Sequence, residues 1–134
     1  MDANLRFMKI IRNAMLIFLG CSAFAASRAK IDHSRPISSS FFYVMAAVAV
    51  ATMGIALVLK QRMVGGAEES LRVNPDDSSA WLRWRAGNIT FLALCAAIAD
   101  FGLVVWFLEA NIAHAIPFFA VAVACMLLLG PRRP

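Results

Sequence analysis

The sequence predicts an all-α polytopic membrane protein, an antiparallel bundle of four transmembrane helices that forms one integral membrane domain over residues 1–134. Of its 134 residues, 61% are hydrophobic and 16% are charged, and the mean hydropathy is +0.72. Soluble domains are about 45–50% apolar and about 25% charged, so this chain has too few polar residues to cover a water-facing fold. The apolar residues also form runs near the length of about 20 residues that a bilayer requires, and basic residues flank these runs.

Four apolar runs are the predicted membrane spans. They lie at about residues 8–27, 41–59, 89–108 and 112–129, and a cytoplasmic loop covers residues 60–88. The second run has no charged residue, and the serines before it can cap its helix. The third is interrupted only by Asp100. Only Glu109, Ala110 and Asn111 separate the third run from the fourth, which predicts a tight antiparallel hairpin.

The first apolar run allows two interpretations. Basic residues, an apolar stretch and the small-x-small pattern at residues 23–25 are typical of a cleaved signal peptide, and residues 18–21 form an imperfect lipobox. Against cleavage, Ile10 and Ile11 extend the helix toward the amino terminus, and Arg12 and Arg28 can snorkel at its two ends. We favour a span that is retained.

The basic residues predict the orientation. With four spans, one side carries ten Lys and Arg residues: Arg6, Lys9, Arg12, Lys60, Arg62, Arg72, Arg83, Arg85, Arg132 and Arg133. The other side carries three: Arg28, Lys30 and Arg35. Because positive residues accumulate in cytoplasmic loops, we expect a multi-pass protein of the inner cell membrane with both termini in the cytoplasm.

The large loop has its own predicted structure. We expect Gly65 and Gly66 to end the second helix, Asn74 and Pro75 to form a turn, and Asp77 or Ser78 to cap a helix that continues into the third span. The same turn and cap account for Asp76 and Asp77 better than a cation-binding loop does. The expected interface anchors on this helix are Trp81 and Trp84 at the headgroup level, with Arg83 and Arg85 near anionic lipid.

Asp100 is the residue that a membrane span does not explain. It recurs at helical spacing with Ala93, Ala96 and Ala97, a stripe on which another helix can pack, and Ala47, Ala51 and Gly54 offer a comparable face on the second span. We expect the Asp100 carboxyl group to be neutral and buried between helices. It then either bonds a partner such as Thr52 or the backbone, takes up and releases a proton or cation, or contacts another subunit.

Two segments resemble a known family. Gly65-Gly66-Ala67-Glu68-Glu69-Ser70-Leu71-Arg72 with Asn74-Pro75-Asp76, and Ala99-Asp100-Phe101-Gly102-Leu103-Val104-Val105, distantly resemble the proteolipid subunit c of rotary ATP synthases over about residues 41–108. In that helical hairpin the return helix carries an ion-binding carboxylate followed by an aromatic-Gly-Leu-Val-Val run. The resemblance implies that Asp100 is the ion-binding carboxylate. Otherwise the sequence is that of a small four-span membrane protein of bacterial type.

Other chemistry-bearing residues are sparse. Cys21, Cys95 and Cys125 lie singly in apolar runs, so we interpret them as buried packing residues. His33 and His114 lack the supporting carboxylates of a haem or metal site. The sequence contains no phosphate-binding glycine loop and no catalytic triad at one membrane depth, so we expect neither an enzyme nor a bound metal or cofactor. The basic residues flank spans and form no solvated stripe, which excludes nucleic acid as the expected partner.

Two functions of different class remain open. The first is a small non-catalytic integral membrane protein that acts as an accessory or assembly partner of other membrane protein subunits or of itself. Helix faces rich in small residues favour this interpretation. The second is a proton- or cation-handling membrane protein that uses Asp100.

The orientation can be tested with reporter fusions. A reporter after Pro134 and one inserted within residues 30–38 are expected to report opposite sides of the membrane, because Lys and Arg divide ten to three between the two sides. Two reporters on the same side would show that the first run is cleaved or does not span.

Overall fold

The computed structural model describes residues 2–28, 40–109 and 111–131, and most of these residues are helical. The helices are α1 (Asp2–Arg28), α2 (Ser40–Lys60), α3 (Gly66–Val73), α4 (Ser78–Glu109) and α5 (Ile112–Leu128), and a π-helical turn, η1 (Gln61–Gly65), links α2 to α3. The predicted all-α bundle is confirmed. Three helical stretches, Ala3–Arg28, Ser40–Val73 and Ser78–Glu109, are long and apolar enough to cross a membrane, and α5 is an apolar helix of 17 residues.

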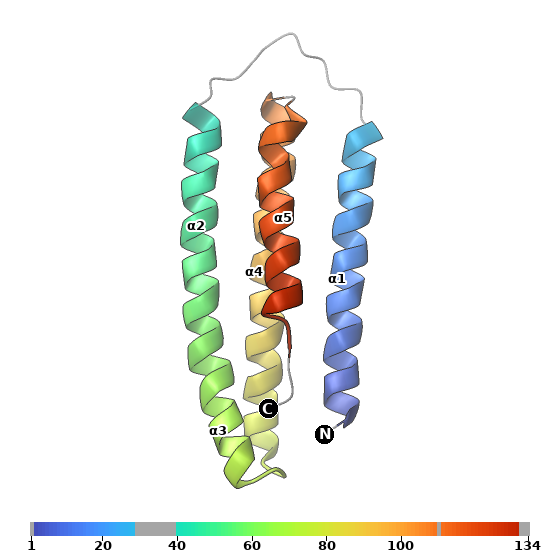
Figure 1. Cartoon of the computed structure of the whole chain (residues 1–134). Coiled ribbons are helices and arrows are strands. Elements are labelled where there is room, and N and C mark those ends of the chain that lie inside the picture. Colours follow the sequence, from blue (N-terminus) through green and yellow to red (C-terminus); the bar gives the residue numbers. More distant parts are fainter. Residues whose placement is uncertain (1, 29–39, 110, 132–134) are drawn as a thin grey trace.

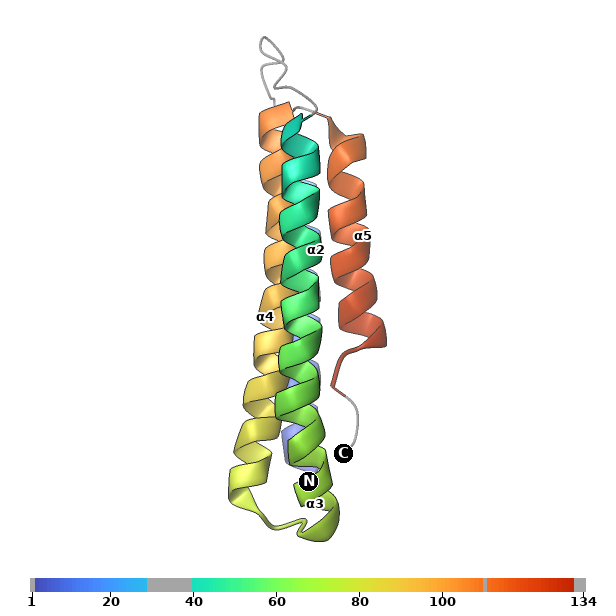
Figure 2. The ribbon, with the colours of Figure 1, turned by 90° about the vertical axis from the view of Figure 1, so that its left-hand side faces the viewer.

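α4 is the central helix of the bundle. It packs against α5, α2, α1 and α3, whereas α1 and α2 flank the α4–α5 pair on opposite sides (Figure 1). α5 lies along one face of α4, with its chain direction reversed (Figure 2). We call the end where α3 is followed by α4 the hairpin end of the bundle. The opposite end, where α4 ends and α5 begins, is the loop end.

The core lies mainly along α4. The large apolar side chains of α4 that are fully buried are Trp84, Phe91, Leu92, Ile98 and Val105. The outward faces are apolar as well, because Ile17 on α1, Val50 on α2 and Ile116 on α5 are exposed. A bundle with apolar residues on both its inner and its outer surface is the arrangement expected when lipid replaces water as the solvent.

Two glycines of α4 mark its closest approaches to its neighbours. A Cβ atom on Gly102 would lie 2.8 Å from Phe118 Cβ and 3.1 Å from the Ala115 carbonyl oxygen of α5. A Cβ atom on Gly87 would lie 2.8 Å from Val64 Cγ2 in η1. Small residues allow helix backbones to approach closely, and packing of this kind drives helix association in lipid.

The predicted helix break at Gly65 and Gly66 is wrong. Both residues have helical backbone angles, and the helix continues through the π turn into α3 as far as Val73. The π turn occurs where η1 packs on Gly87, so tertiary contact maintains helical structure across a glycine pair that the local sequence disfavours. Most of the predicted loop over residues 60–88 is therefore helical.

The turn and cap that follow are as predicted. Asn74 and Pro75 form the turn, in which the Asp77 N–H donates to the Asn74 carbonyl oxygen at 3.2 Å. The Asp77 carboxylate then accepts hydrogen bonds from the Ser79 N–H at 2.9 Å and the Ala80 N–H at 3.2 Å. The Ser79 hydroxyl donates to the same carboxylate. This bond is the largest cause of the lowered pKa of Asp77, and the two N–H bonds lower it further. α4 runs unbroken from Ser78 to Glu109, which confirms the predicted continuous helix.

The glycine contacts predict unequal effects of one substitution at two sites. Gly102→Ala is expected to destabilise the bundle by about 1–3 kcal/mol, because the new methyl group overpacks the α4–α5 contact. The measurement is the free energy of unfolding in mild detergent.

Gly54→Ala is the matched control, because a Cβ atom there meets nothing within 4 Å. It is expected to be neutral or to stabilise the protein by up to about 1 kcal/mol through helix propensity. Equal effects of the two variants would contradict the close α4–α5 contact.

Candidate functional site

Asp100 lies in an open groove between α1 and α4. The groove is lined by Ile11, Ala14, Met15 and Phe18 of α1 and by Ala93, Ala96, Ala97 and Asp100 of α4, and its volume is about 490 Å³. Asp100 and Ala93 are exposed, and Ala96 and Ala97 are half-buried. We call this surface the Asp100 groove.

The expectation that the Asp100 carboxyl group is buried between helices of this chain is therefore wrong. α4 turns its opposite face, with Cys95, Ile98 and Ala99, into the core, and α1 covers only one side of the stripe. Among the described residues that line the groove, none is a Lys or an Arg. The Asp100 carboxyl group therefore lies on the outer surface of the bundle.

The small-residue face of α2 also points outward. Ala47, Ala51 and Gly54 are exposed, whereas Ala49 and Ala56 make the buried contacts of this helix. Within the described residues no helix packs on this predicted packing face, since α2 turns its opposite side to α4. The Thr52 hydroxyl donates to the Val48 carbonyl oxygen at 2.8 Å within α2, and Thr52 does not line the Asp100 groove, so it is not the partner of Asp100.

The two tryptophans at the start of α4 have different environments. Trp84 is fully buried in the core, so its predicted role as an anchor at the headgroup level is wrong. Trp81 is half-buried, and its Nε1 donates to the Pro75 carbonyl oxygen at 2.9 Å, which ties the turn to α4. Arg83 is exposed as expected, but Arg85 is half-buried and donates to the Asn4 side chain of α1.

Basic residues of two helices meet at the carboxyl end of α5. The Lys60 ammonium donates to the Leu129 carbonyl oxygen and lies 4.6 Å from the centre of the Phe91 ring. From α1, Arg12 lies against the tail, because a Cβ atom on Gly130 would be 3.1 Å from Arg12 Cδ. Cations are favourable at a helix carboxyl end, where carbonyl groups lack partners within the helix.

A polar pocket opens where α5 stops short of the hairpin end. Its volume is about 440 Å³, and it is lined by Leu57, Lys60, Gln61, Val64, Gly65, Glu68, Asn88, Leu129 and Gly130. Asn88 is only 1% exposed, and its Nδ2 donates to the Trp84 carbonyl oxygen at 2.9 Å. This hairpin-end pocket thus combines a cation, a carboxylate and a buried amide.

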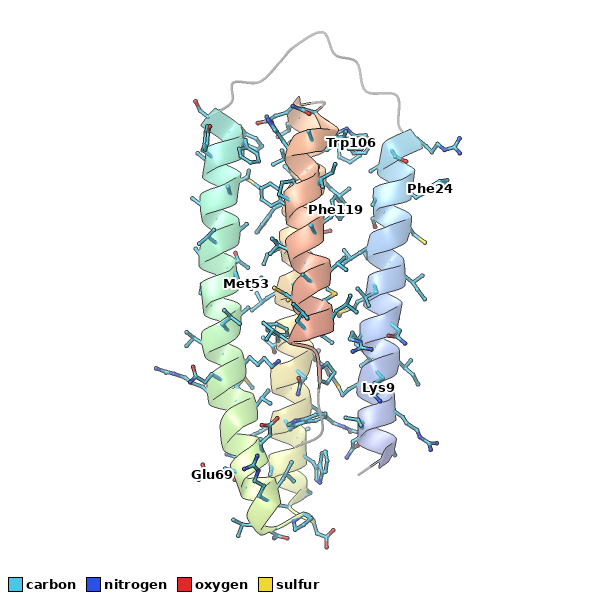
Figure 3. All side chains as sticks on the ribbon, viewed as in Figure 1. Lys9, Phe24, Met53, Glu69, Trp106 and Phe119 are labelled. Carbon is cyan, nitrogen blue, oxygen red and sulfur yellow. The ribbon has the colours of Figure 1, made fainter. Side chains whose placement is uncertain are left out.

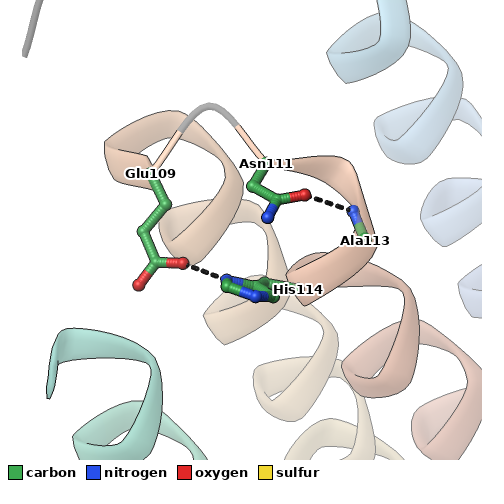
Figure 4. A network of polar contacts seen from close by, with 4 residues as sticks. All are labelled: Glu109, Asn111, Ala113 and His114. Carbon is green, nitrogen blue, oxygen red and sulfur yellow. Dashed lines mark hydrogen bonds and ion pairs between the residues drawn. The ribbon is translucent and has the colours of Figure 1, made fainter. Parts of the chain in front are cut away.

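A second polar cluster joins α4 to α5 at the loop end (Figure 4). His114 Nδ1 and Glu109 Oε2 are 2.5 Å apart, and the Glu109 side chain is only 5% exposed. The Asn111 side chain caps α5 by accepting from the Ala113 N–H at 3.0 Å. His33, the other histidine considered as a ligand, lies outside the described residues. No group of three or more metal-ligating side chains occurs within residues 2–28, 40–109 and 111–131.

The three cysteines are free and differ in environment. Cys95 is buried as predicted, and Cys125 is half-buried with its Sγ 3.8 Å from Met53 Sδ. Cys21 is exposed on α1, so the prediction of a buried packing role is wrong for this residue.

Comparison of the chain with protein-family models, curated proteins and solved structures gave no match. The resemblance to subunit c therefore stays a hypothesis based on residues 65–76 and 99–105.

Sequence reasoning missed Lys60 and Asn88 as partners in one site. Asn88 was the available signal, since it is an amide at the start of a predicted apolar span, one turn after a tryptophan. Lys60 contributes to the sequence analysis only as one of the basic residues that predict the orientation, because no local pattern indicates that a residue 69 positions later supplies its acceptor.

The contacts of Lys60 predict a specific loss of stability. Lys60→Gln is expected to lower the free energy of unfolding by about 1–2 kcal/mol, because the α5 end loses a cation and Phe91 loses its cation–π contact. Thermal unfolding in mild detergent measures this change. Arg62→Gln is the control, since Arg62 is an exposed cation two residues away, and it is expected to change stability by less than about 0.5 kcal/mol. An equal loss in both variants would rule out the capping role.

Proposed function

We propose that this protein is a small non-catalytic integral membrane protein that acts as an accessory or assembly partner of other membrane protein subunits. We further propose that it resides in the inner cell membrane with both termini in the cytoplasm. The three long apolar helices and the apolar outer surface support the membrane setting. The ten-to-three division of Lys and Arg supports the orientation.

The polar residues at the two ends of the bundle suggest where the bilayer lies. Lys60, Arg12 and the carboxyl end of α5 mark one boundary, and Glu109 and His114 mark the other. Between Asn88 and Glu109, α4 rises about 32 Å, close to the hydrocarbon thickness of about 30 Å. Asp100 then lies well inside the hydrocarbon region.

The observation that carries the proposal is the exposure of Asp100, which this proposed bilayer position puts in the hydrocarbon region. A carboxylate facing lipid near the bilayer centre costs at least about 2.5–3.5 kcal/mol. A neighbouring helix that covers the Asp100 groove removes this cost by donating a hydrogen bond, and Ala93, Ala96 and Ala97 let that helix approach closely. The groove is therefore best explained as a contact surface for another transmembrane helix.

Two substitutions of Asp100 separate assembly from proton handling. Asp100→Asn keeps a hydrogen-bonding side chain, so it is expected to retain the co-purifying subunit in mild detergent. Asp100→Leu removes the polar group and is expected to reduce co-purification about fivefold to thirtyfold, since one intramembrane hydrogen bond is worth about 1–2 kcal/mol. Quantitative mass spectrometry of the tagged, detergent-extracted protein measures the ratio.

A pair of alanines provides the steric control. Ala97→Leu fills the Asp100 groove and is expected to reduce co-purification, whereas Ala124→Leu, at an exposed position of α5 away from the groove, is expected to leave it unchanged. If Asp100→Asn and Asp100→Leu both keep the partner but abolish proton flux in reconstituted vesicles, the proton-handling function replaces the assembly function.

A further inference from the structure

We propose that the seam between α2 and α5 binds one phospholipid with a primary ammonium headgroup, of the phosphatidylethanolamine class. Its headgroup occupies the hairpin-end pocket, and one acyl chain lies in the apolar groove that continues along the seam. This site lies apart from the Asp100 groove and does not depend on the assembly role.

The polar groups of the pocket match both charges of this headgroup. The positive charge of Lys60 attracts the phosphate, and the Glu68 carboxylate attracts the ammonium. Asn88 adds a directional acceptor, because its Nδ2 is used by the Trp84 carbonyl oxygen whereas its Oδ1 makes no hydrogen bond with the described residues. An amide oxygen that lines the pocket favours a ligand that brings N–H donors.

The same groups discriminate among headgroups. A choline headgroup has the same charges but no N–H to donate to Glu68 and Asn88. A phosphoglycerol headgroup lacks the cation that would neutralise Glu68. A primary ammonium satisfies the carboxylate and the amide oxygen together, so the pocket selects it by charge and by hydrogen bonding.

The apolar groove gives the acyl chain its place. It is bounded by Ala46 and Val50 of α2 and by Pro117 and Val121 of α5, with Ile98 of α4 at its floor, and its volume is about 310 Å³. Met53 borders this groove and Leu57, one helical turn later, borders the polar pocket. Figure 3 shows Met53 on α2 at the level of α5, so both pockets follow one seam along the helix axis.

The unequal lengths of the helices explain why the seam changes from apolar to polar. α5 has 17 residues and α4 has 32, so α5 leaves the first part of α4 uncovered on this side. Asn88 lines the pocket just beyond the end of α5, where Lys60 donates to the Leu129 carbonyl oxygen. A polar pocket that continues into an apolar groove matches a lipid, whose polar headgroup is followed by an apolar acyl chain.

The test compares bound lipids in two matched variants. The full-length protein is equilibrated in vesicles of equal parts phosphatidylethanolamine, phosphatidylcholine and phosphatidylglycerol, extracted in mild detergent, and its retained lipids are quantified by mass spectrometry. We expect phosphatidylethanolamine to be enriched, and Glu68→Gln to reduce that enrichment about threefold to fivefold, which is what a partly exposed ion pair supplies. Glu69→Gln is the control, because Glu69 is exposed on the outer side of α3 (Figure 3) and does not line the pocket.

Several results would overturn the proposal. Retained lipids in the proportions of the vesicles, enrichment of phosphatidylglycerol, or equal effects of Glu68→Gln and Glu69→Gln would each exclude selection of a primary ammonium. Glycerophosphoethanolamine, which has no acyl chain, is expected to leave the bound lipid in place, and its ability to displace that lipid would exclude the groove as the site of the chain. Equal thermal stability of the two variants is expected and separates lipid loss from misfolding.

Discussion

The close approach of α4 to its neighbours is the constraint on which the rest of the bundle depends. In lipid, burial of apolar surface does not by itself drive helices together, so packing contacts supply most of the association energy. α4 provides these contacts by placing glycine at the crossing points, with Gly102 against Phe118 of α5 and Gly87 against Val64 of η1. Because α1 and α2 lie on opposite sides of α4, each depends on this helix for its position.

The unequal lengths of the helices determine the structure of the hairpin end. α5 ends at Leu128, while α4 and the α2–α3 stretch continue toward the hairpin end. The end of α5 is therefore completed by residues of other helices, with Lys60 from α2 and Arg12 from α1. The same shortfall leaves Asn88 beside a polar pocket instead of beneath a helix.

Small residues have two different roles in this chain. At Gly87, Ala99 and Gly102 they are buried and allow close helix packing. At Ala47, Ala51 and Gly54, and around Asp100, they lie on the outside of the bundle. The outer faces are available to other transmembrane helices, and the Asp100 carboxyl group makes one of them chemically specific. The proposed assembly role depends on this outer face.

Composition and hydropathy alone determined that the chain is an all-α membrane protein, because apolar runs of this length have few other stable structures. Local chemistry also predicted the Asn74–Pro75 turn, the cap at Asp77 and the unbroken helix α4, since each depends on neighbours within a few residues. The glycine pair at 65 and 66 is the exception, because the contact of η1 with Gly87 outweighs local propensity.

Only the tertiary structure decided which face of each helix is inside. In a soluble bundle the polar face identifies the outside, but here both faces of α2 and α4 are apolar, so spacing alone could not separate the inward Ala49 and Ala56 from the outward Ala47 and Ala51. Asp100 and Trp84 were assigned to the wrong environment for the same reason. The sequence could not predict the pairing of Lys60 with the end of α5 either. The two lie far apart in the chain, and their contact depends on where α5 ends.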